Sequence, residues 1–255
     1  MHSCKQRKLV QTYDRIGRFF TGSHLSPTFT HPTFVLQRII QQDIRKYAQN
    51  ITGIVLDVGA GTGPYEHYFS KVLRYVKADI VCNGDIKPDV VCSAESLSFS
   101  QNVFDALLCF QVLEHIPNPV RFVREARVVL KNGGYLLITA PFIYSYHDRI
   151  DYQRFTHIWW EKKLVSEGFE IICIQKQGGV FVTIGTLCLI SIHGFHRLPP
   201  SMVAKGALAM VKLLLLPGIV LLSVLVNAAM SLLDELDQTN EYVSNYLVLA
   251  RRRAC

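Results

Sequence analysis

Residues 54–64 read IVLDVGAGTGP, an apolar run followed by three glycines at alternate positions and a proline. The apolar run predicts a short buried strand. Gly59, Gly61 and Gly63 allow the backbone to turn tightly and to approach a bound molecule. Pro64 suits the first position of a helix, and a helix N-terminus offers free N–H groups to an anion. The stretch therefore predicts a strand, a glycine loop and a helix start that together bind a ligand.

An acidic residue completes this pattern. Asp79 ends the next predicted strand, 20 residues after Gly59. A carboxylate at about this distance accepts hydrogen bonds from ribose hydroxyls in nucleotide-binding folds. Asp85 is a rival for the same role, although it lies in a turn-like NGD segment. The glycine loop and the acid together favour a nucleotide-like cofactor.

Apolar runs alternate with helical patterns through most of the remaining chain, which predicts an α/β fold with a Rossmann-like, doubly wound sheet. The predicted helices cover residues 33–49, 119–131 with Asn118 as the cap, and 157–165 with Thr156 as the cap. The predicted strands are IVLDV (54–58), YVKAD (75–79), DVVCS (89–93), FDALLCF (104–110), YLLITA (135–140), FEIICI (169–174) and NYLVLA (245–250).

In combination, these motifs resemble those of class I S-adenosylmethionine-dependent methyltransferases. The resemblance covers residues 50–176 and is strongest to the type 11 group, which includes the ubiquinone/menaquinone-biosynthesis methyltransferases. It implies a seven-stranded sheet whose last strand is antiparallel, with S-adenosyl-L-methionine as the cofactor. The segments that carry it are DVGAGTG (57–63), SAESLSF (93–99), FDALLCFQVLEHIPNP (104–119) and LKNGGYLLITAP (130–141).

The resemblance also implies which residues bind the cofactor. The glycine loop would hold the methionine end, Asp79 the ribose, and the segment around Ser93 the adenine. Many relatives carry aspartate where this chain has Ser93, whose hydroxyl is a weaker partner for the adenine amino group. The implied cofactor-binding residues are Asp57, Gly59, Ala60, Gly61, Gly63, Asp79, Ile80, Ser93, Ala94, Glu95, Phe110 and Gln111.

Candidate acid–base residues follow the fourth and fifth predicted strands. His147 and His115 are candidates to take a proton from a hydroxyl nucleophile, since imidazole titrates near neutrality. Tyr152 is a third candidate, in a stretch, HDRIDYQRFT (147–156), that resembles a segment lying over the active site in relatives. Alternatively, these side chains orient a helix start or pin their loop through hydrogen bonds.

The segment after the fourth strand also bears on the acceptor. It reads FQVLEH, where many amino-methylating enzymes carry an Asn/Asp-Pro-Pro-aromatic motif. By family analogy this favours O- or C-methylation of a small or lipophilic acceptor. Two alternatives stay open: a non-catalytic membrane-associated scaffold or regulator that retains the fold, and a nicotinamide-dependent oxidoreductase, against which the GxGxG spacing argues.

Composition limits the partners and the compartment. The formal net charge is +7, but the basic blocks are short and terminal, so we expect no nucleic-acid partner. Seven cysteines, an odd number without a CxxC pair, predict neither a disulfide framework nor a metal site. The first 20 residues contain no apolar signal-like run, which favours the cytoplasmic side. The oligomeric state stays open.

Residues 178–241 form a hydrophobic insertion between the last two predicted strands. Within it LLLLPGIVLLSVLVNAAMSLL (213–233) carries no formal charge and is long enough to span a bilayer. A single crossing would separate two strands that should pair, and the other apolar run, 180–192, is too short to span. We therefore expect helices that lie in one leaflet or re-enter it. The alternatives are a dimer interface or a soluble helical cap.

The sequence thus predicts four parts and a membrane-attached methyltransferase. The parts are an N-terminal extension and helix (1–49), a methyltransferase core (50–177), the insertion (178–241), and a final core strand with a basic tail (242–255).

Overall fold

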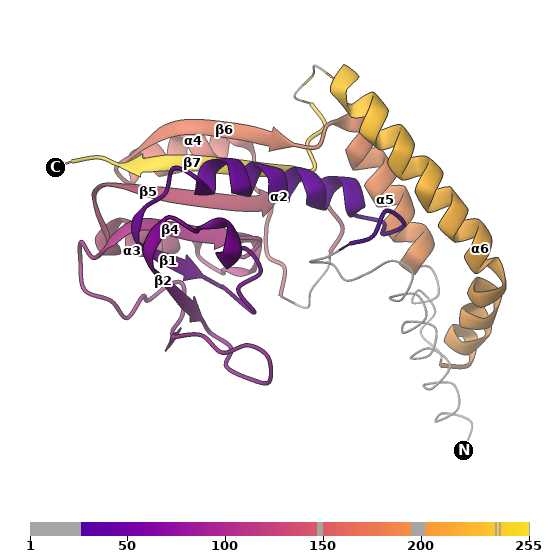
Figure 1. Ribbon diagram of the computed structural model, residues 1–255, viewed down its shortest axis with the longest axis horizontal. Helices are drawn as coiled ribbons and strands as arrows, with labels where there is room; N and C mark the ends of the chain where they lie inside the picture. The colour runs from indigo at the N-terminus through magenta and orange to yellow at the C-terminus, as the bar shows by residue number, and fades with distance from the viewer. Residues whose placement is uncertain (1–26, 147–149, 195–201, 238, 240, 255) are drawn as a thin grey trace. The chain divides into compact units, whose positions relative to one another are not determined.

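The computed structural model describes residues 27–146, 150–194, 202–237, 239 and 241–254 (Figure 1). The chain separates into two compact units. The larger unit comprises Ile40–Gln177 and Val243–Cys255, and the smaller unit comprises Met1–Ile39 and Gly178–Tyr242.

The larger unit is built on a seven-stranded sheet with the order β3-β2-β1-β4-β5-β7-β6. Strands β1 to β5 run parallel, and β7 pairs antiparallel with both β5 and β6. This confirms the predicted Rossmann-like sheet with an antiparallel last strand. The strands are β1 (Gly53–Val58), β2 (Val72–Asp79), β3 (Val90–Val91), β4 (Phe104–Phe110), β5 (Leu130–Pro141), β6 (Phe169–Gln177) and β7 (Asn245–Arg252).

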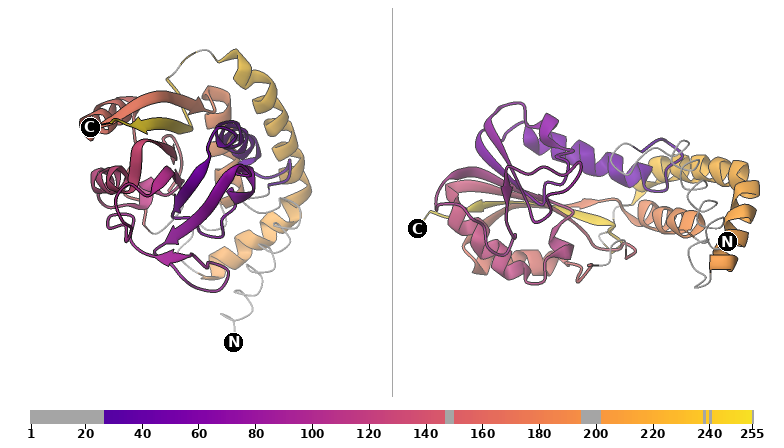
Figure 2. Two further views of the ribbon diagram at one scale, coloured as in Figure 1. Left: turned by 60° about the vertical axis from the view of Figure 1, so that its left-hand side comes forward. Right: turned by 90° about the horizontal axis from the view of Figure 1, so that it is seen from below.

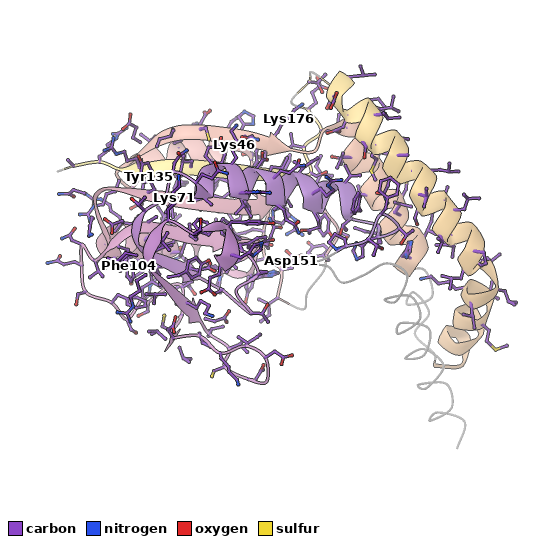
Figure 3. The ribbon with its side chains drawn as sticks, viewed as in Figure 1. Lys46, Lys71, Phe104, Tyr135, Asp151 and Lys176 are labelled. Carbon is purple, nitrogen blue, oxygen red and sulfur yellow. The ribbon has the colours of Figure 1, made fainter. Side chains whose placement is uncertain are left out.

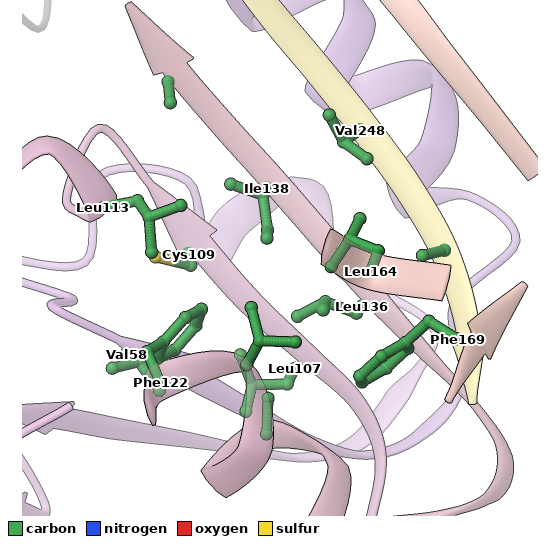
Figure 4. Close-up of a cluster of buried hydrophobic side chains, with 14 of the residues drawn as sticks. Val58, Leu107, Cys109, Leu113, Phe122, Leu136, Ile138, Leu164, Phe169 and Val248 are labelled. Atoms are coloured by element: carbon green, nitrogen blue, oxygen red, sulfur yellow. The ribbon is translucent and has the colours of Figure 1, made fainter. Parts of the chain in front are cut away.

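Helices cover both faces of this sheet. The part of α2 (Phe34–Ala48) that belongs to the larger unit lies on one face, and α3 (Pro119–Val129) and α4 (His157–Ser166) lie on the other (Figure 2). The central strands are therefore buried on both sides, which explains why FDALLCF in β4 is almost continuously apolar. The core on the α3 and α4 side includes Leu107, Phe122, Leu136, Ile138, Leu164, Phe169 and Val248 (Figure 4).

Local capping signals start two of these helices. The side chain of Asn118 accepts a hydrogen bond from the backbone N–H of Arg121 at 3.1 Å, at the start of α3. Thr156 caps α4 in the same way, through the N–H of Trp159 at 3.2 Å. Such bonds satisfy donors that the first turn of a helix leaves without a helical partner.

One predicted helix start is wrong. After the glycine loop, the chain forms only a three-residue 3-10 helix, Glu66–Tyr68, so Pro64 does not begin an α-helix. The connection to β2 is short. Tyr65 and Phe69 anchor it by packing on Phe110, with ring centroids 5.2 and 6.3 Å away. The prediction failed because glycine next to proline marks a turn as readily as a helix start.

Loops also replace helices in two later connections of the described chain. Residues 80–89 join β2 to β3, and residues 92–103 join β3 to β4, without an α-helix. Helix α3 ends at Val129, two residues before its predicted end, because β5 already begins at Leu130. The carboxyl edge of β1 and β2 is therefore bordered by loops.

The smaller unit contains a hairpin of two helices. Helices α5 (Val180–Gly194) and α6 (Met202–Leu233) lie side by side. Gly185 permits their close approach, because a Cβ at this position would lie 2.4 Å from Sδ of Met230.

Two aspartates join the end of α6 to the start of α5. Asp234 accepts a hydrogen bond from the N–H of Gly179 at 2.9 Å, and Asp237 accepts one from the N–H of Val180 at 2.9 Å. The two carboxylates accept hydrogen bonds from backbone N–H groups that have no partner within α5. Their negative charge is also stabilised by the positive N-terminal end of the helix dipole. This aspartate clamp makes the hairpin antiparallel, so the chain enters and leaves it at the same end.

The α3 cap generates a stability prediction. Asn118→Ala removes the oxygen that accepts from Arg121, so we expect the free energy of unfolding to fall by about 1 kcal/mol in urea titrations. Asn118→Ser keeps a capping oxygen and serves as the control, with an expected change below about 0.5 kcal/mol. Equal losses in the two variants would contradict the capping role.

Candidate active site

The glycine loop of residues 59–63 forms one side of the site. Gly59, Gly61 and Gly63 have positive φ angles of 71°, 55° and 72°. Residues with a side chain rarely adopt this left-handed conformation, so glycine is favoured at all three positions. A Cβ on Gly59 would also lie 2.5 Å from the Val112 side chain. The glycine therefore lets the loop approach the segment that follows β4.

Asp79 connects the end of β2 to this loop. Its Oδ2 accepts a hydrogen bond from the N–H of Gly61 at 2.8 Å, and its Oδ1 accepts one from the N–H of Val81 at 2.9 Å. Each carboxylate oxygen has two lone pairs, so both keep the capacity to accept from a further donor such as a sugar hydroxyl. The rival Asp85 is exposed and does not line the cavity at this edge.

A cavity of about 500 Å³ opens at the carboxyl ends of β1, β2 and β4. Strand order reverses here, because β1 has β2 on one side and β4 on the other. Open α/β sheets bind their ligands at such a switch point, and the volume is typical of small-molecule sites. The cavity is lined by Val58, Gly59, Asp79, Ile80, Val81, Cys92, Ser93, Ala94, Glu95, Val112, His115, Ile116, Pro117, Ile150 and Tyr152.

The structure brings together half of the predicted cofactor-binding residues and two of the three predicted catalytic residues. His147 lies outside the described residues. The predicted residues in the cavity wall are Gly59, Asp79, Ile80, Ser93, Ala94, Glu95, His115 and Tyr152. Those that are not in the wall are Asp57, Ala60, Gly61, Gly63, Phe110 and Gln111.

Ser93 and Glu95 form a turn in the cavity wall. The Ser93 hydroxyl oxygen accepts a hydrogen bond from the N–H of Glu95 at 3.2 Å. The Glu95 carboxylate in turn accepts from the N–H of Asn118 at 3.2 Å. A hydroxyl can also donate, whereas the ionised aspartate of many relatives only accepts. This chain therefore offers a different hydrogen-bonding group at the position implied for the adenine.

Asp57 lies at the end of β1 with only 3% of its surface exposed. The Tyr75 hydroxyl donates a hydrogen bond to its Oδ2 at 2.7 Å. Burial raises the pKa of Asp57 to about 7, while the bond from Tyr75 lowers it and the charge of Asp79 raises it. With a pKa of about 7, this carboxyl group changes between its protonated and ionised forms near neutral pH.

Residues 150–154 contact the short 3-10 helix Leu113–His115, which follows β4. The N–H of Tyr152 donates to the Glu114 carbonyl at 2.9 Å, and Nδ1 of His115 bonds to the Ile150 carbonyl. A carbonyl only accepts, so Nδ1 of the neutral His115 ring carries the proton and Nε2 carries the lone pair. The contact therefore selects the tautomer in which His115 can act as a base through Nε2.

Glu114 is a charged residue of this region that was not predicted as part of the site. Its side chain is fully buried, and its Oε1 lies 3.7 Å from Nε2 of His115. Burial raises the pKa of Glu114 to about 7, while a backbone hydrogen bond and the charge of Arg154 lower it. Arg154 bonds in turn to Asp151, with Nη2 and Oδ2 2.8 Å apart. Figure 3 labels Asp151 among the side chains of the larger unit. The only sequence signal was an acid within an apolar run, which is typical of a paired or functional group.

The pKa of Asp57 generates a prediction about stability and pH. The pKa rises from the usual 3.8 to about 7 on folding, so the folded state binds the proton more tightly between these values. The resulting stabilisation is complete below about pH 4 and is lost as pH rises to 7, with a slope of at most about 1.4 kcal/mol per pH unit. We expect the free energy of unfolding of the wild type, relative to Asp57→Asn, to fall across this window in urea titrations. Parallel pH profiles would contradict the assignment.

Comparison with known proteins agrees with the fold of the larger unit. Residues 56–138 match the family model described as a methyltransferase domain. An uncharacterized protein of Methanocaldococcus jannaschii is 29% identical over 101 residues, which cover 38% of this chain and 44% of that protein. A ubiquinone biosynthesis O-methyltransferase of Xanthomonas campestris is 29% identical over 105 residues, which cover 34% of this chain and 42% of that protein.

A solved structure shows the same fold over more of the chain. A SAM dependent methyltransferase from Archaeoglobus fulgidus has a TM-score of 0.52 at 15% identity, covering 84% of this chain and 94% of the other. The chain spans about half the length of the curated relatives it matches, so their names describe more than the shared region. The family match over residues 56–138 and the strand order agree with the class I S-adenosylmethionine-dependent methyltransferase fold that the sequence motifs predict.

Proposed function

We propose that this chain transfers a methyl group from S-adenosyl-L-methionine to oxygen or carbon of a small or lipophilic acceptor, while attached to a membrane on its cytoplasmic side. The proposal of methyl transfer rests chiefly on one observation. The glycine loop, Asp79 and the turn of Ser93 and Glu95 all line the same cavity. The similarity to a ubiquinone biosynthesis O-methyltransferase supports an acceptor with a hydroxyl group.

The cavity fits this cofactor in size and chemistry. About 500 Å³ suits a nucleoside, and Asp79 has lone pairs to accept from ribose hydroxyls. Ile80 is 71% exposed and provides an apolar surface for a flat base, with the polar atoms of Glu95 nearby in the same wall. The backbone of the glycine loop would lie against the charged methionine end, with the Asp57 carboxyl group close to this loop at the end of β1.

The chemical demands on the protein are modest. When bound, the cofactor supplies a methyl group already activated by its sulfonium. The chain therefore has to position the acceptor in line with that methyl group and exclude water. For a hydroxyl acceptor, His115 would take the O–H proton at Nε2 as the oxygen bonds to the methyl carbon. The Ile150 carbonyl supports this role by keeping the proton of the neutral ring on Nδ1.

Asp79→Ala tests the cofactor site. We expect the Kd for S-adenosylhomocysteine, measured by calorimetry, to rise at least tenfold, because hydrogen bonds to a charged carboxylate are lost. Asp85→Ala is the matched control and should bind like the wild type. Equal Kd values for the two variants, or no binding by the wild type, would overturn the assignment. Binding without methyl transfer to a lipid extract would favour the non-catalytic scaffold.

Helix α6 supports membrane attachment because two polar side chains near its middle are buried, whereas many of its leucines are exposed. Ser223 and Asn227 are fully buried, and the Asn227 amide donates to the Phe29 carbonyl at 2.7 Å. Leu214 and Leu225, in contrast, are 81% and 58% exposed. Proteins in water favour the opposite arrangement, whereas in lipid the polar side chains turn toward the protein interior. Among the described side chains of α6, the large exposed apolar ones are Met210, Val211, Leu213, Leu214, Leu215, Leu221, Leu222, Leu225, Leu232 and Leu233.

The breadth of this surface favours lipid over a protein partner. Leu213, Leu214 and Leu215 are consecutive, and helical steps of about 100° spread them over about 200° of the circumference. A flat partner would cover less than that, and protein interfaces also contain aromatic and polar groups. Residues 213–233 carry no charge. The segment Met210–Leu236 has the length and composition of a membrane-crossing helix, and its most apolar 18 residues have a mean hydropathy of 2.4.

The hairpin geometry supports an in-plane or re-entrant arrangement. Helix α5 has 15 residues, which makes it about 22 Å long and shorter than the hydrocarbon core of about 30 Å. The aspartate clamp holds the end of α6 at the start of α5. A chain that leaves the hairpin where it entered returns to the same side of the membrane.

Charged residues on the outer surface of α6 should abolish membrane binding. The double variant Leu214→Glu, Leu225→Glu places two carboxylates against lipid, so we expect at least a tenfold loss of liposome binding in sedimentation assays. Leu73→Glu is the control, because Leu73 is an 84% exposed leucine on β2 in the larger unit. Wild type should be released by detergent and not by salt. A wild type that stays monodisperse without detergent and does not sediment would refute membrane attachment.

A further inference from the structure

A row of side-chain amides crosses the larger unit from α2 to the end of β4. Nε2 of Gln177 donates a hydrogen bond to Oδ2 of Asp43 at 2.9 Å. Nδ2 of Asn245 donates to Oε1 of Gln177 at 2.6 Å, and Nε2 of Gln111 donates to Oδ1 of Asn245 at 3.0 Å. We call Gln177, Asn245 and Gln111 the amide relay. Its members come from β6, β7 and the segment after β4, so it connects distant parts of the sheet.

The carboxylate of Asp43 sets the direction of every amide in the relay. An ionised carboxylate only accepts hydrogen bonds, so Gln177 has to turn its NH₂ group toward Asp43. The oxygen of Gln177 then faces Asn245, which has to present its own NH₂ group in turn. The oxygen of Asn245 then faces Gln111, so Gln111 has to turn its own NH₂ group toward Asn245. Reversing one amide would bring two donors or two acceptors together.

This direction leaves an oxygen as the last atom of the relay. Nε2 of Gln111 donates both to Asn245 and to the hydroxyl of Thr139, at 3.0 and 3.1 Å, which uses its two hydrogens. Oε1 of Gln111 therefore ends the relay as an acceptor. Within the described part of the chain, no donor is bonded to it.

Gln111 is held at the edge of the sheet that carries the cavity. It directly precedes Val112, which lines the cavity wall. Its backbone has a φ of 56°, and its N–H donates to the Thr139 carbonyl at 2.8 Å. A residue with a side chain adopts this left-handed conformation only where the surrounding structure holds it, as happens at functional sites.

The charge of Asp43, which we call the anchor of the relay, indicates that the relay does more than provide hydrogen-bond partners for buried amides. Gln177, Asn245 and Thr139 are almost fully buried and need partners. Amides running in either direction would provide these partners equally well. A carboxylate at one end makes a single direction stable, and the consequence of that direction is the acceptor oxygen of Gln111.

We infer that Asp43, Gln177 and Asn245 are positioning residues, which hold Oε1 of Gln111 as a hydrogen-bond acceptor for an N–H or O–H group of a molecule bound at the methyltransferase site. The inference rests on the proposed function. Two groups have the required chemistry, the ammonium group of the cofactor and a hydroxyl group of the methyl acceptor.

Three variants separate this role from a general effect on folding. Gln111→Leu removes the acceptor oxygen, and Gln177→Leu breaks the relay without changing Gln111. Gln175→Leu is the matched control, because Gln175 also donates to Asp43, at 2.7 Å, but lies off the route to Gln111. Each is compared with wild type for the Kd of S-adenosylhomocysteine, by calorimetry, and for methyl transfer from radiolabelled S-adenosylmethionine into a total lipid extract.

We expect Gln111→Leu and Gln177→Leu each to cause about a tenfold loss in one of the two assays, with Gln175→Leu unchanged. A tenfold rise in Kd assigns the donor to the cofactor. A tenfold fall in the transfer rate at saturating cofactor, with Kd unchanged, assigns it to the methyl acceptor. The double variant of Gln111 and Gln177 should match Gln111→Leu alone, because the relay acts through that oxygen.

Two results would overturn the inference while leaving the proposed function intact. One is a Gln111→Leu variant that equals wild type in both assays. The other is a further loss on adding Gln177→Leu to Gln111→Leu, which would reveal a structural role. Wild type that binds no S-adenosylhomocysteine would overturn the proposed function and the inference together.

A replacement variant is available if Gln177→Leu does not fold, as judged by thermal unfolding. Asp43→Leu then takes its place with the same expectation, because Asp43 is partly exposed and its loss also breaks the relay.

Discussion

Strand β7 pairs antiparallel with β5 on one side and with β6 on the other, so the sheet is complete only when the chain returns from its insertion. The last residue of β6, Gln177, and the first residue of β7, Asn245, are register partners. Whatever lies between them has to start and finish at one place. The aspartate clamp meets this demand inside the smaller unit, by joining the two ends of the helical hairpin. The side chains of the same two register partners also carry the amide relay.

Local signals were enough to predict most of the sheet and its site. Apolar runs bounded by turn residues located the strands, and Asn118 and Thr156 located the starts of α3 and α4. The glycine spacing and Asp79 predicted the edge at which the cavity lies, because parallel strands present their carboxyl ends together. These features depend on residues close in sequence or on the general topology of α/β sheets, so a single sequence contains them.

The errors and omissions have a different origin. Pro64 suggested a helix, but the rings of Tyr65 and Phe69 pack on Phe110 and hold a tighter turn. Phe110 lies far along the chain, and no local pattern identifies it as the partner. The same limit applies to the amide relay, whose anchor, Asp43, lies in a helix that precedes the first strand. Each of these features depends on non-local contacts, which become visible only when the strands are in register.

Hydropathy and burial give different information about α6. The sequence shows that the helix is apolar, which fits a core helix, an interface or a membrane segment equally well. The structure adds which residues face inward, and the inward residues include the polar Ser223 and Asn227. That reversal, more than the length of the helix, is the observation that supports the proposed lipid environment of α6.

The pairing of Gln177 with Asn245 also bears on how this protein is assembled from parts. Neighbouring antiparallel strands need only about two to five residues to connect them. A short turn could therefore replace residues 178–244, while the sheet and the cavity wall are encoded entirely outside them. The hydrophobic hairpin is then a separate structural unit, inserted at a turn between neighbouring strands, where folds tolerate additional residues. A chain without it would keep the seven strands and every residue that lines the cavity.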